Sequence, residues 1–159
     1  MTTLDTRPTP VRADGQVDAR GPRFAAVVTT LVLALVLVTL GSTLSLVLLA
    51  AQTAVFALGA LVGLSAQPYG AFFRAVVRPR LAPPTRFEDA TPPRFAQAVG
   101  LGFALVGLVA LLAGVAVVAY AAVGLALAAA FLNAAFDFCL GCEMYLLGRR
   151  LLGARSASA

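Results

Sequence analysis

Residues 95–113 read FAQAVGLGFALVGLVALLA and contain no charged side chain. An apolar run of this length crosses the hydrocarbon core of a bilayer when it is helical. Three further apolar runs occupy residues 24–40, 44–66 and 121–147, and only the last of these contains carboxylates. The sequence therefore predicts an all-α membrane protein, a bundle of four transmembrane helices.

The composition supports the same class of protein. The chain has 159 residues, of which 60% are hydrophobic and only 12% are charged, whereas a soluble domain has about 25% charged residues. The net charge of +5 comes entirely from arginine, and there is no histidine, which excludes an imidazole base or ligand. Arginines that flank apolar spans contact lipid headgroups, so we expect the lipid bilayer and not nucleic acid as the partner of this charge.

The polar segments divide the chain. Residues 1–23 have no apolar periodicity and are expected to form a disordered cytoplasmic tail. They do not resemble a cleaved signal peptide, so the first span is expected to be retained. The expected order after the tail is a first transmembrane hairpin over 24–66, an Arg- and Pro-rich loop with an interfacial helix over 67–94, a second hairpin over 95–150 and a short tail over 151–159.

The two hairpins begin alike. Pro22-Arg23-Phe24-Ala25 opens the first hairpin, and Pro93-Arg94-Phe95-Ala96 opens the second. Each is followed by two spans with an uncharged turn between them, and each hairpin ends in an arginine cluster. This pattern suggests two parallel helical-hairpin repeats. The alternative is that the tetrapeptide recurs by chance in a chain rich in Ala and Arg.

The arginines also predict the topology. All twelve lie in the N-terminal tail, the central loop or the C-terminal tail, and none lies in the turns near Gly41 and Gly114. Positively charged loops stay in the cytoplasm. The sequence therefore predicts a multi-pass protein with both termini and the central loop on the cytoplasmic side.

Residues 133–145, NAAFDFCLGCEMY, hold the candidate chemistry. Cys139 and Cys142 have the C-x-x-C spacing of dithiol redox pairs and of half a zinc site. If the fourth span continues as one helix, Cys142 lies roughly 10 Å and Cys139 about 15 Å from Arg149 along the axis. Both thiols would then be reachable from the cytoplasm, a reducing compartment in which a dithiol is expected. This position near the helix C-terminus disfavours a thiolate.

Two carboxylates accompany the cysteines. Asp137 and Glu143 are candidates for a proton relay, and Asp137 is expected near the membrane midplane, either protonated or bonded to Asn133 or another span. The alternative is purely structural. Asn133 and Asp137 would then cross-link helices through Gln97 or Gln52, Glu143 would pair with a terminal arginine, and the cysteines would be inert packing residues.

Several of these motifs together resemble one family. They are Gly21-Pro22-Arg23-Phe24, Pro92-Pro93-Arg94-Phe95-Ala96-Gln97, Asn133-Ala134, and Cys139-Leu140-Gly141-Cys142 with Tyr145. The resemblance covers about Asp18 to Leu152, and the family comprises small bacterial integral membrane proteins known only as a domain of unknown function. It implies four spans in the bacterial inner membrane and genomic neighbours of the thioredoxin-like and rhodanese-type sulfurtransferase classes. It implies no activity.

A looser resemblance is to quinone-coupled thiol oxidoreductases of the vitamin K epoxide reductase type, which also have a four-span bundle with a C-x-x-C in the last span. This is a likeness of architecture only. In that type the dithiol faces the outside, whereas the arginines here predict a cytoplasmic pair.

Three functions follow from the sequence. The first is thiol redox or sulfur-relay chemistry, in which Cys142 exchanges with a thioredoxin-like or rhodanese-type partner and Cys139 resolves the mixed disulfide. The second is a scaffold without chemistry that recruits such a partner, and the third is a small transporter for a sulfur species. No cofactor is predicted, since quinone or zinc has no support beyond the cysteines, and two thiolates with one carboxylate lack a fourth zinc ligand unless the protein forms a homo-oligomer.

Overall fold

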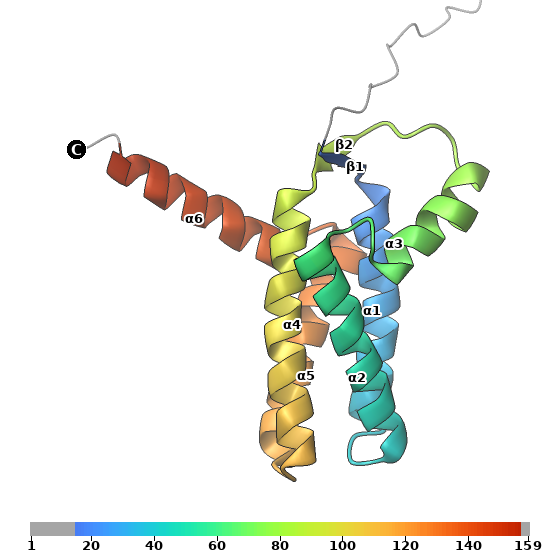
Figure 1. The fold of residues 1–159 in the computed structure, drawn as a ribbon, viewed down its shortest axis with the longest axis vertical. Coiled ribbons are helices and arrows are strands. Elements are labelled where there is room, and N and C mark those ends of the chain that lie inside the picture. Colours follow the sequence, from blue (N-terminus) through green and yellow to red (C-terminus); the bar gives the residue numbers. More distant parts are fainter. Residues whose placement is uncertain (1–14, 157–159) are drawn as a thin grey trace, which may run out of the picture.

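The computed structural model describes residues 15–156, with side chains up to residue 152. Four long apolar helices form an antiparallel bundle (Figure 1). They are α1 (Arg20–Val38), α2 (Thr43–Ala57) with its π-helical continuation η1 (Leu58–Val62), α4 (Thr91–Leu112) and α5 (Ala116–Phe136). Each is long and apolar enough to cross a bilayer. The predicted all-α bundle of a multi-pass membrane protein is confirmed.

Two tight turns close the hairpins at the lower end of the view in Figure 1. Each contains a glycine with a positive φ, 92° at Gly41 and 74° at Gly114, a conformation that side chains with a Cβ rarely adopt. Ser42 caps the next helix, because its hydroxyl oxygen accepts the backbone N–H of Ser45 at 3.2 Å. These uncharged turns lie opposite the ends of the spans that carry the arginines.

Small residues bring the helices of the bundle close together. A Cβ on Gly107 of α4 would lie 2.9 Å from the side chain of Val123 on α5, so only glycine allows this approach. Large apolar side chains such as Val117 and Val109 are exposed on the outer faces, where they meet lipid. The buried cluster consists of Leu33, Val36, Leu49, Phe56, Ala104, Val123 and Ala126.

The two hairpins exchange equivalent contacts. Arg23 of α1 donates from Nε to the carbonyl oxygen of Ala134, near the end of α5, at 3.2 Å. Arg94 of α4 donates from Nε and Nη2 to the carbonyl oxygens of Ala60 and Leu61, at the end of η1, both at 2.8 Å. The arginine that begins each hairpin thus caps the last helix of the other. This reciprocity favours an internal repeat over chance recurrence.

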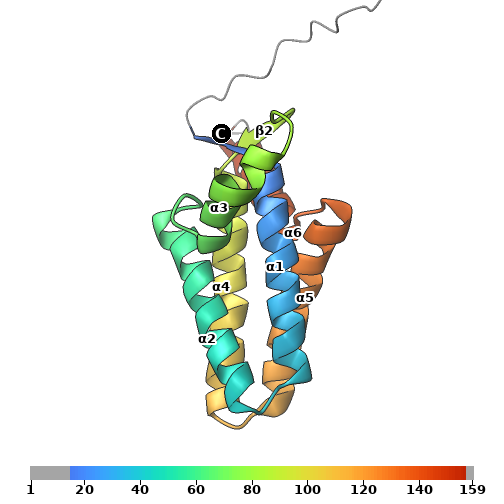
Figure 2. The ribbon, with the colours of Figure 1, turned by 90° about the vertical axis from the view of Figure 1, so that its right-hand side faces the viewer.

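A shorter helix follows each hairpin. The first is α3 (Pro68–Phe72), which continues as η2 (Phe73–Val77) and η3 (Arg78–Arg80), and the second is α6 (Leu140–Ser156). Both leave the same end of the bundle on opposite sides (Figures 1 and 2). Phe24 packs on Phe73 with ring centroids 5.6 Å apart, and Phe95 packs on Tyr145 at 5.7 Å. The helix predicted after residue 67 therefore has a counterpart in the second repeat.

The prediction of one continuous helix over residues 121–147 is wrong. Helix α5 ends at Phe136, Asp137 has the left-handed backbone (φ 56°), and α6 begins at Leu140. The sequence did not reveal this break, because Phe136 and Phe138 on either side of Asp137 are as apolar as the residues of a membrane span. The C-x-x-C pair consequently lies at the junction of two helices, with Cys139 before α6 and Cys142 within it, outside the fourth span.

A short antiparallel ribbon connects the N-terminal segment to the central loop. Strand β1 (Gln16–Asp18) pairs with β2 (Phe87–Asp89), with Val17 opposite Glu88. Helix α1 then begins at Arg20. The expected disordered tail is thus wrong for residues 16–23, whereas residues 1–14 lie outside the described part of the chain.

The docking of α6 on α4 generates a prediction. A Cβ on Gly141 would lie 2.7 Å from both Cα and Cβ of Ala96, and overpacking of this kind costs about 1–3 kcal/mol. Gly141→Ala should therefore lower the thermal unfolding midpoint in detergent by several degrees. Gly148→Ala is the control on the same helix, because nothing lies within 4 Å of its added Cβ. Equal midpoints for the two variants would contradict the docking of α6.

Candidate functional site

The cysteines lie at an elbow between α5 and α6. Helix α5 closes with backbone hydrogen bonds from Asp137 N–H to Asn133 O (3.1 Å) and from Phe138 N–H to Leu132 O (3.3 Å). Aspartate tolerates the left-handed conformation that this closure requires. Cys139 then precedes the first residue of α6, and its carbonyl oxygen accepts the N–H of Glu143 at 3.0 Å. Cys139 is therefore the N-cap of α6.

A disulfide joins Cys139 and Cys142, whose Cα atoms are 5.2 Å apart, within the range that a disulfide requires. The expected dithiol is not the form seen here. The backbone departs from the helix before Cys139. The Cys142 N–H also donates to Cys139 Sγ at 3.3 Å, as an N-cap atom accepts from the first turn.

The elbow reverses the electrostatic environment predicted for the pair. In a continuous helix the cysteines would lie near a C-terminus, where the macrodipole disfavours a thiolate. In the structure Cys139 is the N-cap of α6 and Cys142 lies in its first turn. A helix N-terminus stabilises a thiolate, so this position no longer disfavours the thiolate form of Cys139.

Both cysteines line a polar pocket of about 240 Å³. Its walls come from the N-terminal ends of α1, α4 and α6, the end of α5, and strand β2. The charged side chains on these walls are Arg23, Arg86, Glu88, Asp89, Asp137 and Glu143. The predicted residues Asn133, Asp137, Cys139, Cys142 and Glu143 are thus brought together around one cavity.

The predicted location of Asp137 at the membrane midplane is wrong. Its side chain is 48% exposed at the end of α5, and Oδ2 lies 3.9 Å from Nη1 of Arg86. Glu143 is also exposed, on the first turn of α6. Both carboxylates are therefore exposed at the pocket, where the charged form does not have to be desolvated.

Sequence reasoning missed the contribution of β2 to this pocket. Burial raises the pKa of the Glu88 carboxyl, against the lowering effect of Arg86, whose Nη2 lies 3.8 Å from Oε2. The Thr91 backbone N–H and hydroxyl donate to Asp89 at 2.8 and 2.7 Å and lower the pKa of Asp89. The pKa values of these two adjacent carboxyl groups are thus shifted in opposite directions by their different environments. No spacing in the sequence links this strand to residues 139–142, since the β-ribbon is too short to show a pattern.

An apolar cavity of about 260 Å³ lies on the other side of Cys139, within the bundle. Asn133 and Cys139 line both this cavity and the polar pocket, whereas Cys142 lines only the polar pocket. Of the two cavities, Cys142 therefore faces the polar pocket alone, whereas Cys139 faces both. Among the described residues, no three His, Cys, Asp or Glu side chains are grouped as metal ligands would be.

The intramembrane glutamines do not bond to Asn133 or Asp137. Gln52 is fully buried, donating to Thr29 Oγ1 at 3.5 Å and accepting from the Tyr69 hydroxyl at 2.8 Å. Gln97 accepts from Gln67 Nε2 at 3.1 Å. Both networks connect spans to the region of α3. The first network lies within the first hairpin, whereas the second joins the two hairpins through Gln97 of α4, which also lines the apolar cavity with Cys139.

The fold and the elbow together define a multi-pass membrane protein, a bundle of two helical hairpins with a C-x-x-C at the mouth of a polar pocket. The chain belongs to the family DUF4395, a domain of unknown function, which matches residues 17–150. The family resemblance drawn from the sequence motifs is thereby confirmed. No curated protein and no solved structure matches the chain.

The link between Tyr69 and Gln52 can be tested by mutation. Burial raises the pKa of Tyr69, so its hydroxyl remains a donor at neutral pH. Tyr69→Phe leaves the buried Gln52 Oε1 without its donor, which should cost about 1–3 kcal/mol and lower the unfolding midpoint in detergent. Tyr120→Phe is the control, since Tyr120 is half-exposed on α5. A loss of stability no larger than that of the control would contradict the bond.

Proposed function

We propose that this protein exchanges disulfides with a soluble dithiol partner through Cys139 and Cys142. The observation that carries the proposal is the position of the pair, an N-cap disulfide of α6 that lines a polar pocket. Buried inert cysteines need neither a helix N-terminus nor a polar cavity beside them.

The first step is attack by a partner thiolate on Cys142 Sγ, the sulfur that lines only the polar pocket. A bond forms between the partner sulfur and Cys142 as the Cys139–Cys142 bond breaks. Cys139 leaves as a thiolate, held by the Cys142 N–H and the N-terminal dipole of α6. A stabilised thiolate is the better leaving group, so the geometry supports the assignment of exchange to Cys142.

The second step releases the partner. Its second thiolate attacks the partner sulfur of the mixed disulfide, so the partner becomes a disulfide and Cys142 leaves as a thiolate. Two electrons pass from the partner to the pair, and the two partner protons end on Cys139 and Cys142. Glu88 has a raised pKa beside the pocket, which suits it to deliver these protons. Asp137 and Glu143 connect the pocket to solvent.

The partner class comes from the family resemblance, which implies thioredoxin-like and rhodanese-type neighbours. A thioredoxin-like protein supplies the two thiols that the exchange requires. Once the pair is reduced, the Cys142 thiolate would attack the outer sulfur of a rhodanese-type persulfide, so that a Cys142 persulfide forms and the rhodanese cysteine leaves as a thiolate. In both cases the partner reaches the pair through the polar pocket. The scaffold alternative differs in needing no sulfur chemistry.

The orientation proposed for the site is cytoplasmic, in the inner membrane of a bacterium with both termini inside. Within the described residues, every arginine lies at the end of the bundle that carries α3, α6 and the ribbon, opposite Gly41 and Gly114. Arginine-rich segments stay in the cytoplasm. The pocket then opens toward cytoplasmic thiol proteins.

Reporter fusions test this orientation. A reporter that is active only in the cytoplasm should function after Ala159 and between Pro83 and Pro84. A reporter at Gly114 should function only if it is of the kind that is active outside. Matching activity at Pro83 and Gly114 would contradict the proposed topology.

Single-cysteine variants test the chemistry. After mild oxidation with a purified thioredoxin-like protein whose second cysteine is replaced by serine, Cys139→Ser should accumulate a mixed disulfide at Cys142, because neither Cys139 nor the partner then offers a second thiol that could resolve it. Cys142→Ser should accumulate several-fold less adduct, since Cys139 is partly turned to the bundle cavity. Non-reducing gels with mass spectrometry identify the adducts, and the double serine variant is the control. Absence of adducts from both single variants, with unchanged partner recruitment by the double variant, would favour the scaffold.

A further inference from the structure

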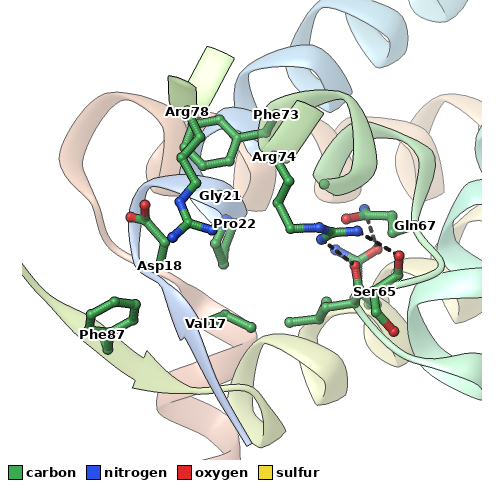
Figure 3. Close-up of a pocket in the computed structure, with 13 residues that line it drawn as sticks. Val17, Asp18, Gly21, Pro22, Ser65, Gln67, Phe73, Arg74, Arg78 and Phe87 are labelled. Atoms are coloured by element: carbon green, nitrogen blue, oxygen red, sulfur yellow. Dashed lines mark hydrogen bonds between the residues drawn. The ribbon is translucent and has the colours of Figure 1, made fainter. Parts of the chain in front are cut away.

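The first repeat has its own elbow, formed by residues 63–67 between η1 and α3. It encloses a cavity of about 280 Å³ against the start of α1 and strand β2 (Figure 3). Gly63 has a φ of 130° at this turn, as Asp137 has the positive φ at the disulfide elbow. The two breaks are thus equivalent in the two repeats, but this one contains arginines where the other contains cysteines.

Two guanidinium groups line the cavity. Arg74 donates to the carbonyl oxygens of Leu64 (3.4 Å) and Ser65 (2.7 Å), which fixes it across the elbow. Gly70 makes room for it, since a Cβ there would lie 3.3 Å from Nη1 of Arg74. Figure 3 shows Arg78 reaching toward Asp18 and Pro22. Within residues 15–152, the guanidinium group of Arg78 has no hydrogen bond and no salt bridge, and Arg78 bonds only through its backbone.

The nearby carboxylate does not neutralise these groups. Asp18 is held by Arg20, with Nη2 to Oδ2 at 2.8 Å and Nε to Oδ1 at 3.0 Å, and its Oδ1 also accepts the Arg20 N–H at 3.1 Å. The guanidinium groups of Arg20 and Arg78 therefore lie near one carboxylate, while that of Arg74 bonds to the backbone of the elbow. Like charges one helical turn apart, such as Arg74 and Arg78, repel each other, and an anion between them would relieve this repulsion.

The remaining walls are apolar and are formed by Val17, Pro22, Leu64, Phe73 and Phe87. The cavity lies where α1 begins and η1 ends, which is the boundary of the spans. Basic pockets at this level, on the side that carries the positive charge, bind phospholipid headgroups. We propose that this cavity binds a phosphate ester through Arg78 and Arg74, and that the apolar walls favour one carried by an anionic phospholipid.

The proposed site is independent of the disulfide chemistry. A bound phosphate would join η3 to the start of α1 and so stabilise the first elbow. Charge-assisted bonds from arginine to phosphate are strong and suit the planar guanidinium. Arg78 is the informative residue because Arg74 also supports the backbone of the elbow.

The experiment measures thermal unfolding of the full chain in detergent with three probes: phosphatidylglycerol, phosphatidylcholine and sn-glycerol 3-phosphate. A ligand that binds the folded state raises the midpoint with concentration. Phosphatidylglycerol should raise it for wild type and for Arg80→Gln, the control, since exposed Arg80 is on η3 and does not line the cavity. Arg78→Gln should bind about tenfold more weakly, and Arg78→Lys should recover part of the loss.

The probes separate the sources of the phosphate. A response to phosphatidylglycerol at concentrations where sn-glycerol 3-phosphate has no effect supports the lipid, whereas equal responses to both support a soluble phosphate ester at the same site. Equal weakening by Arg78→Gln and Arg80→Gln would overturn the proposal, as would a full response to phosphatidylcholine that Arg78→Gln leaves unchanged. Absence of any response in wild type would also overturn it.

Discussion

The last turn of a membrane helix exposes backbone carbonyl oxygens that have no partner within the helix. In this bundle an arginine of the opposite hairpin meets them, Arg23 at the end of α5 and Arg94 at the end of η1. A cation at a helix C-terminus also complements the macrodipole. Because each cap crosses between hairpins, it holds the halves together and determines where each second span stops. Both elbows lie directly beyond these caps, so both cavities depend on them.

The two elbows have similar backbones and present different side chains. Each leaves the helical path through a residue with positive φ, Gly63 in the first repeat and Asp137 in the second. Each is followed by a helix whose aromatic side chain packs on a phenylalanine in the first span of the same hairpin, Phe24 in α1 or Phe95 in α4. The difference is in what the following helix presents. One presents Arg74 and Arg78 to an apolar cavity, and the other presents Cys139 and Cys142 to a polar one.

The sequence was sufficient for the features that depend on composition and local pattern. The four spans, the repeat of Pro-Arg-Phe-Ala and the family resemblance all follow from such signals. The elbow at Asp137 does not, because aspartate occurs both as a buried carboxylate within a helix and as a left-handed residue that ends one. The neighbouring Phe136 and Phe138 are compatible with both possibilities, since both are apolar. The contribution of Glu88 was equally inaccessible, since only the pairing of β1 with β2 brings it to the cysteines.

The position of the break changes the chemical interpretation more than it changes the fold. As part of a continuous span, the pair would lie at a helix C-terminus at different depths, and only proximity to the cytoplasm would distinguish the sulfurs. With the break at Asp137, Cys139 becomes an N-cap whose sulfur accepts the Cys142 N–H. The environments of the two sulfurs then differ, since Cys139 Sγ accepts a backbone N–H at a helix N-terminus, whereas Cys142 lines the polar pocket and not the apolar cavity. That asymmetry is what an exchange reaction needs, because attack and departure must occur at different sulfurs.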